Sequence, residues 1–261
     1  MPLPSSIATI SQLPFDHKRD LYLDLVPAEI LDQFQLSPFL VDRQGRQLLT
    51  IKDSPKSSSV ELFLYHKYGF QDPIVYCHLT DTLNGQIHVL LYIMNDPNSE
   101  RYDVDRMPDG TPTKFGTHVR NIPAEEQAFA AGYLPGQLRR GLNLLSEAKD
   151  SFERFIANLG HTIYFVNPLY YHNAVIFEKY GFAYQAGRKR MERIHQGFTP
   201  GGEFVSLLDN SAFRKQGAQN QIRLRSWAIH DGIMGESFDG VTMYKTIGAH
   251  AGINTAPNTG W

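Results

Sequence analysis

One stretch, residues 138–182, constrains the fold more than any other part of this 261-residue chain. Its first half carries apolar residues at three- and four-residue spacing, which is typical of the buried stripe of an amphipathic helix. Since Gly160 is suited to end such a helix, the pattern predicts a helix from about Gly136 to Leu159, roughly 36 Å long. The apolar positions are Leu138, Leu142, Leu145, Phe152, Phe155, Ile156 and Leu159.

Two shorter elements follow that helix. Residues 162–166 are β-branched and aromatic, which predicts a buried strand that ends at Asn167 and Pro168. Residues 172–180 then predict a short helix, which Gly181 terminates. The order helix, strand, helix indicates an α/β protein in which helices pack on a sheet.

The flanking segments add a β-hairpin and several single elements. Residues 73–80 and 86–94 predict two strands joined by an Asn84-Gly85 turn. The second of these strands is almost continuously apolar, so we expect it to be central and covered on both faces. Helices are predicted at 27–34, 60–68 and, for one or two turns, 124–131, strands at 101–107, 188–195 and 241–247, and alternation at 222–230. The tail, residues 248–261, is expected to cross the surface or to be ordered by a ligand or partner.

Composition excludes several classes of function. The formal net charge of −2 gives no electrostatic case for binding nucleic acid or an anionic membrane. The single cysteine, Cys77, excludes a framework of intrachain disulfides and is typical of a reducing compartment. No apolar run reaches the length of a membrane span, and the first residues lack the features of a secretion signal. We therefore expect a cytoplasmic protein.

The central stretch, with its closing Phe177-Glu-Lys-Tyr-Gly-Phe182, resembles the C-terminal half of the GNAT-type N-acyltransferases. The resemblance implies an α/β (α+β) fold with a mixed, largely antiparallel central sheet flanked by helices. It implies a GNAT-like core at residues 48–195, an N-terminal segment at 1–47 packed on it, and a C-terminal extension at 196–261. The implied reaction transfers an acyl group from acetyl-CoA, another acyl-CoA or a carrier with the same pantetheine arm. The acceptor would be a small-molecule or peptide amine, and homodimerisation is compatible with this fold.

The start of the predicted long helix is the expected cofactor site. A helix N-terminus offers unpaired N–H groups and the positive end of a dipole, both of which favour a pyrophosphate. The family pattern is Arg/Gln-x-x-Gly-x-Gly/Ala; Gly141 matches its first glycine, whereas Leu138 and Asn143 depart from it. Asn167 is placed to bond a pantetheine amide or to cap the next turn. The alternative is an ordinary core helix with solvated arginines. The expected pyrophosphate ligands are Gln137, Arg139, Arg140, Gly141 and Asn143.

Three residues are the catalytic candidates. Asp103 and Asp105 would lie on one face of the strand predicted at 101–107, where a carboxylate can take the proton of the attacking amine. The same pair is also typical of a divalent-cation site or of a solvated strand edge. Tyr171 is the candidate acid for the leaving thiolate, because the family's tyrosine position holds Phe177; the alternative is that its ring only packs.

Two other functions stay open. The departures from the family pattern also suit a non-catalytic GNAT-like protein that binds a ligand or partner. His230-Asp231 and His250 suggest a metal-dependent enzyme, although no metal-binding spacing motif is present and no metal ligand is assigned. Residues 108–134 form a connection too long for a compact α/β unit, which indicates an insertion of undetermined role.

Overall fold

The computed structural model describes residues 4–261. Its strands form a seven-stranded sheet in the order β1-β2-β3-β4-β5-β7-β6, in which β1 to β4 are antiparallel and β5 runs parallel to β4. The predicted fold class, a mixed and largely antiparallel sheet flanked by helices, is confirmed. The strands are β1 (Leu49–Lys52), β2 (Ser59–Leu64), β3 (Val75–Asp81), β4 (Ile87–Met94), β5 (Ile163–Val166), β6 (Ala183–Ala186) and β7 (Thr242–Thr246). The α-helices are α1 (Ile7–Ile10), α2 (Phe15–Leu23), α3 (Ala28–Gln33), α4 (Ile122–Ala130), α5 (Leu145–Asn158), α6 (Tyr171–Lys179), α7 (Arg188–Gly197) and α8 (Ile222–His230).

The chain divides into two compact units, each built from separate segments. Unit 1 contains residues 1–97, 141–167 and 244–250, and unit 2 contains residues 98–140, 168–243 and 251–261. The division expected from the sequence, at 47/48 and 195/196, stays a prediction. No helix among residues 4–261 is both long and apolar enough to cross a bilayer.

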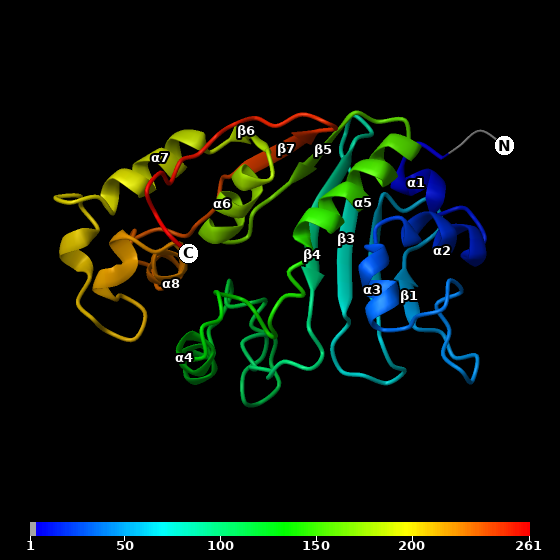
Figure 1. Ribbon diagram of the computed structural model, residues 1–261, viewed down its shortest axis with the longest axis horizontal. Helices are drawn as coiled ribbons and strands as arrows, with labels where there is room; N and C mark the ends of the chain where they lie inside the picture. The colour runs from blue at the N-terminus through cyan, green and yellow to red at the C-terminus, as the bar shows by residue number, and fades with distance from the viewer. Residues whose placement is uncertain (1–3) are drawn as a thin grey trace. The chain divides into compact units, whose positions relative to one another are not determined.

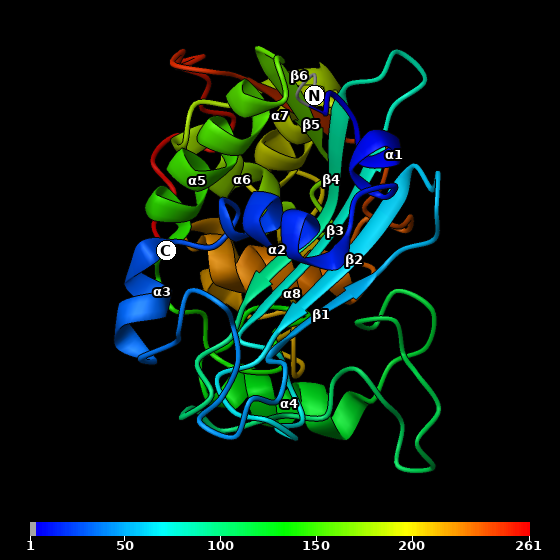
Figure 2. The same cartoon turned by 90° about the vertical axis from the view of Figure 1, so that its right-hand side faces the viewer.

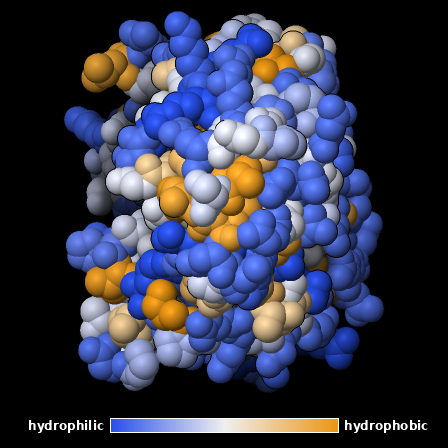
Figure 3. Space-filling view, turned by 90° about the vertical axis from the view of Figure 1, so that its left-hand side faces the viewer, coloured by the Kyte–Doolittle hydropathy of each residue, from blue (hydrophilic) through white to orange (hydrophobic). Residues whose placement is uncertain are grey.

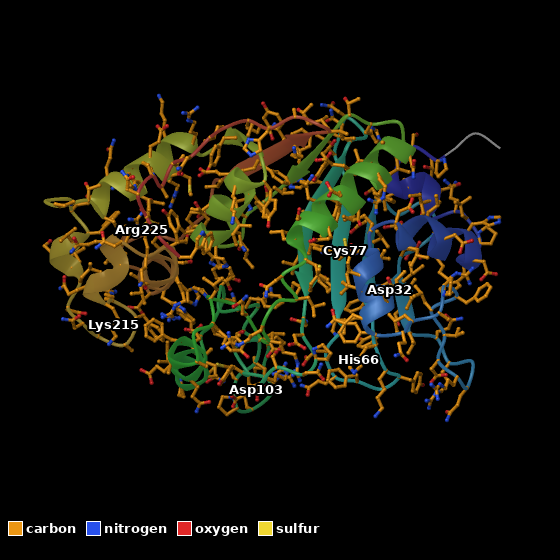
Figure 4. The ribbon with its side chains drawn as sticks, viewed as in Figure 1. Asp32, His66, Cys77, Asp103, Lys215 and Arg225 are labelled. Atoms are coloured by element: carbon orange, nitrogen blue, oxygen red, sulfur yellow. The ribbon has the colours of Figure 1, made fainter. Side chains whose placement is uncertain are left out.

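In unit 1, helices α2, α3 and α5 cover one face of the strands β1 to β5 (Figures 1 and 2). Tyr22 of α2 packs on Phe155 of α5, and Phe152 of α5 packs on Tyr92 of β4. The opposite face carries half-buried side chains such as Tyr76, whose hydroxyl donates to Glu61. Cys77 lies on the covered face of β3 and is fully buried (Figure 4).

The hairpin of unit 1 confirms one prediction and corrects another. Strands β3 and β4 pair as expected from the Asn84-Gly85 turn. The helix predicted at 60–68 is wrong, because Val60, Leu62 and Leu64 are buried at every second position and form strand β2. The helix was predicted because Gly69 follows this segment, but the alternation of buried and half-buried residues is that of a strand.

The long helix is shorter than predicted. Helix α5 spans Leu145–Asn158, and the helix expected to start near Gly136 is therefore wrong over its first nine residues. Gly136 and Asn143 both have positive φ, which interrupts helical geometry twice. Leu138 packs on the cluster around Tyr102 in unit 2, whereas Leu142 packs on the core of unit 1. Leu138 and Leu142 have the sequence spacing of one helical stripe, but they pack on two different cores.

Unit 2 is mainly helical. Its core includes Trp227 of α8, which stacks on Phe213 and donates to the carbonyl of Tyr133. The strand predicted at 188–195 is wrong, since this segment is helix α7. The alternating segment 222–230 is helix α8. The strand predicted at 101–107 is also wrong, because these residues are irregular. The face shown in Figure 3 is mostly hydrophilic, with apolar residues gathered near its middle.

Residues 251–261 of the C-terminal tail belong to unit 2 and are held by it. The backbone N–H and the hydroxyl of Thr255 both donate to the buried carboxylate of Glu178 on α6. The amide of Ala251 donates to the carbonyl of Gly181, and that of Ile222 to Gly260. These contacts hold the tail on unit 2.

Candidate functional site

Strand β4 leaves its neighbour β5 after three residue pairs. Ile87, His88 and Val89 pair with β5, and no pair follows Val89. The pairing of β4 with β3 shifts at the same place, so that Leu90 has no partner on β3. This is a β-bulge, which bends a strand and is common beside functional sites. Figure 1 shows the two strands diverging from this point.

The bulge opens an edge of β4 from Leu90 to Met94, called here the open edge. Among the described residues, the backbone of this segment forms ladder pairs only with β3, and the next bridge on the other side joins Asn95 to Gly141. All five side chains of the open edge are apolar or aromatic and only partly buried. Two of them, Tyr92 and Met94, pack on the core of unit 1, so the other three form the apolar surface beside the unpaired backbone edge.

Asn167 lies where the sequence placed it, directly after β5, and is near His88 of β4. Burial lowers the pKa of His88, although the nearby Asn167 side chain acts in the opposite direction. The Nε2 atom of His88 is buried without a hydrogen-bond partner among the described residues, beside the start of the open edge. The assignment of Asn167 to a pantetheine amide stays a prediction.

The expected pyrophosphate ligands do not lie at a helix N-terminus. Helix α5 starts at Leu145, so Gln137, Arg139, Arg140, Gly141 and Asn143 all lie in the preceding loop. This corrects the premise of the site, which was a set of free helix amides beside two arginines.

The side chains of that loop contact protein instead. Gln137 accepts from the amide of Leu134, and Arg139 donates to the carbonyl of Ser99. Arg140 donates to the carbonyl of Ala131 and stacks on the ring of Tyr133.

The true start of α5 is unfavourable for an anion. Its first turn contains Glu147, whose Oε2 atom is buried without a hydrogen-bond partner in the described part of the chain. A carboxylate in the first turn competes with a phosphate for the positive end of the helix dipole.

Asp103, labelled in Figure 4, and Asp105 lie in an irregular loop of unit 2. Both carboxylates are ion-paired. Arg101 donates to both carboxylates, and Arg106 contacts Asp105 at 3.2 Å. The arginines compete for the lone pairs that a base or a cation site would use. The role of Asp103 or Asp105 as the catalytic base stays a prediction.

Unit 2 contains a separate pocket with a volume of about 690 Å³, called here the unit 2 pocket. It is formed by the start of α6, the end of α8, residues 116–117 and the glycine-rich loop after α8. The residues that carry its chemistry are Thr117, Tyr170, Tyr171, Ser226, His230 and Phe238.

One wall of the unit 2 pocket is a buried charge network. His230 Nε2 lies 2.9 Å from Glu125 Oε1, and Arg120 donates to the other oxygen of Glu125 and to Asp231. Burial disfavours the ionised Glu125, but the hydrogen bonds from His230 and Arg120 outweigh it and lower its pKa. A side chain at Gly116 would meet this pair, since an added Cβ would lie 2.7 Å from Glu125 Oε1.

A second wall joins α6 to α8. His172 Nδ1 lies 2.8 Å from the hydroxyl of Ser226, and burial lowers the pKa of His172 to about 3, which keeps the ring neutral. Tyr170 donates its hydroxyl to the carbonyl of Phe115. Tyr171, the predicted acid, is buried and accepts a hydrogen bond from Arg225 Nη1 at 3.0 Å.

Sequence reasoning found some of these residues and missed others. Tyr171 and His230 were singled out, but Glu125, Ser226 and Arg225 were not. Their partners lie 54 to 105 positions away in the chain, and no spacing motif marks contacts of that range.

No protein-family model, curated protein or solved structure matches this chain. Within residues 4–261, no group of three His, Cys, Asp or Glu side chains is arranged to hold a metal ion.

Proposed function

We propose that this chain is an N-acyltransferase that binds the pantetheine arm of an acyl thioester along the open edge of β4. The single observation that carries the proposal is the bulge at Leu90, together with the end of β5 pairing at Val89. The element order also supports it, because α5, β5, α6 and β6 follow one another as the resemblance to GNAT-type enzymes implies, although helix α4 is inserted between β4 and α5.

The open edge has the chemistry that a pantetheine arm needs. Pantetheine is extended and contains two amides, so it can pair with an unpaired strand edge as an added strand does. Tyr92 and Met94 pack on the core of unit 1, so the half-buried side chains of Leu90, Leu91 and Ile93 would cover its methylene groups. A backbone N–H at the bulge would then be free to polarise a thioester carbonyl, as an oxyanion-hole donor does.

The nucleotide end of coenzyme A contributes little in this proposal. Arg139 and Arg140 are engaged with backbone carbonyls, and Glu147 occupies the first turn of α5. The donor is therefore acyl-CoA, acetyl-CoA or a carrier-bound thioester, and its common part, the pantetheine arm, provides the recognition.

The remaining parts of the proposal rest on the sequence. The acceptor is a small-molecule or peptide amine, Asp103 or Asp105 is the base, Tyr171 is the leaving-group acid, and the reaction takes place in the cytoplasm. A non-catalytic GNAT-like protein would bind the same donor without transferring its acyl group.

Calorimetry with acetyl-CoA and S-acetylpantetheine tests the donor site. We expect both to bind, with dissociation constants within about tenfold of each other, because the shared arm makes the contacts. Asn167→Ala should weaken both by about tenfold, the value of one or two hydrogen bonds. Asn84→Ala, at the far turn of the same hairpin, is the matched control and should bind normally.

Two results would contradict the donor site. One is the absence of binding by either thioester. The other is tight binding of acetyl-CoA that free 3′-phospho-ADP inhibits and S-acetylpantetheine does not, since recognition would then lie in the nucleotide.

A further inference from the structure

The unit 2 pocket lies beside a buried arginine that has no acidic partner. Arg225 of α8 is 1% exposed (Figure 4). Its guanidinium donates to the carbonyls of Ala218 and Gln219 and to the hydroxyls of Tyr171 and Thr259, and lies 3.3 Å from His195. None of these groups is a carboxylate, and no ion pair of Arg225 exists within residues 4–261. A buried charge without a counter-charge is costly, so it favours an anion nearby.

Tyr171 connects this charge to the pocket. Its oxygen accepts the hydrogen bond from Arg225, so its own hydroxyl proton is not used in that bond. No acceptor for that proton is present among the described residues, and Tyr171 lines the pocket. The hydroxyl is thus a donor, polarised by a cation behind it, that a ligand in the pocket can use.

The carboxylates around the pocket already have other partners. Glu178, the buried carboxylate whose charge acts on Tyr171, accepts hydrogen bonds from Thr255 and Tyr184, and the others pair with arginines. Glu125 pairs with Arg120, and Asp231 pairs with Arg120 and Arg214. The two carboxylates that line the pocket, Glu236 and Asp239, both pair with Arg190. Arg225 is therefore the buried cation of this region that lacks a carboxylate partner.

The rest of the lining fits an apolar body. The ring of Phe238 packs edge-on against Tyr171, with ring centres 6.3 Å apart, and Tyr170 and Ile229 complete this part of the wall. We propose that the unit 2 pocket binds a small carboxylate with an aromatic or apolar body, through the hydroxyl of Tyr171 and the positive charge of Arg225. This inference does not depend on the donor site along β4, because no residue of unit 1 takes part in it, but it gives Tyr171 an anion-binding role in place of the role of leaving-group acid.

The first test compares three probes of similar shape on the unmodified protein. Benzoate, benzamide and benzylamine are titrated while the NMR signals of the protein are followed. We expect benzoate to bind at least about tenfold more tightly than benzamide, and benzylamine to bind most weakly. Equal affinities, or no benzoate binding at millimolar concentration, would overturn the proposal.

The second test uses neighbouring tyrosines as a matched pair. Tyr171→Phe removes the available hydroxyl and should weaken benzoate binding about tenfold. Tyr170→Phe removes a hydroxyl already donated to Phe115 and should change benzoate affinity less than about twofold. Thermal melting confirms that each variant is folded. Normal benzoate affinity in folded Tyr171→Phe, or an equal loss in both variants, would show that this donor does not bind the anion.

Discussion

At the scale of single residues, His172 shows how burial decides chemistry. The ring is fully enclosed, has Ser226 as its hydrogen-bond partner, and has a pKa of about 3 because burial disfavours the cation. In the unfolded chain the same ring has its ordinary pKa of about 6.5. The unfolded state therefore binds a proton that the folded state excludes as the pH falls below about 6.5.

This difference predicts a pH dependence of stability. The contribution of His172 is fully present above about pH 6.5 and is lost as the pH falls toward 3. Between pH 7 and pH 5 the free energy of unfolding should fall by about 2 kcal/mol from this residue alone. Urea unfolding at the two pH values measures it. In His172→Gln that part of the fall should disappear, and an unchanged slope in the variant would contradict the assignment.

The residue scale also marks what sequence reasoning can find. Tyr171 was found because it precedes a recognisable short helix, and Asn167 because it ends a recognisable strand. Arg225 was missed because only the fold shows that this buried arginine has no carboxylate partner. Asp103 and Asp105 were found by their spacing, but the spacing could not show that Arg101 forms an ion pair with both carboxylates.

At the scale of elements, the segment before α5 is a loop in the structure, whereas the sequence pattern predicted a helix there. Asn143 has a φ of 60° and precedes the helix, whereas the sequence pattern placed it in the second turn. Glycine is favoured over alanine in a left-handed conformation, and alanine over glycine within a helix.

A pair of substitutions at this position measures which interpretation holds. Asn143→Ala should reduce the free energy of unfolding by about 1 kcal/mol, and Asn143→Gly should change it by less than about 0.5 kcal/mol. Chemical denaturation of both variants gives the comparison. The reverse order, with the alanine variant the more stable, would place Asn143 inside a helix.

At the scale of the whole molecule, the sequence predicted the class of fold and the order of its central elements. The β3–β4 hairpin, β5, α6 and β7 were predicted because each has a strong local pattern and a clear turn residue at its end. Segments 60–68, 101–107 and 188–195 were assigned wrongly because short patterns of mixed polarity suit both helix and strand, and contacts distant in sequence decide between them.

The C-terminal tail makes a contact of this kind, between Thr255 and Glu178. We expect its removal to reduce the free energy of unfolding. Thr255 donates its hydroxyl to the buried Glu178 at 2.6 Å. Thr255→Val leaves that carboxylate short of a donor, so the free energy of unfolding should fall by about 2 kcal/mol. Thr259→Val, which removes only bonds of 3.3 and 3.4 Å, is the control and should cost less than about 0.5 kcal/mol. Equal effects would show that the tail does not contribute through Glu178.

The central claim is that an acyl thioester pairs with the open edge of β4, and hydrogen exchange of the backbone amides measures it most directly. In the free protein, the amides of residues 90–94 that do not bond to β3 should exchange rapidly, whereas those bonded to β3 are protected. Saturation with acetyl-CoA or S-acetylpantetheine should slow the rapid set by at least about tenfold and leave β2 unchanged. Binding of either thioester with no added protection at residues 90–94 would contradict the claim.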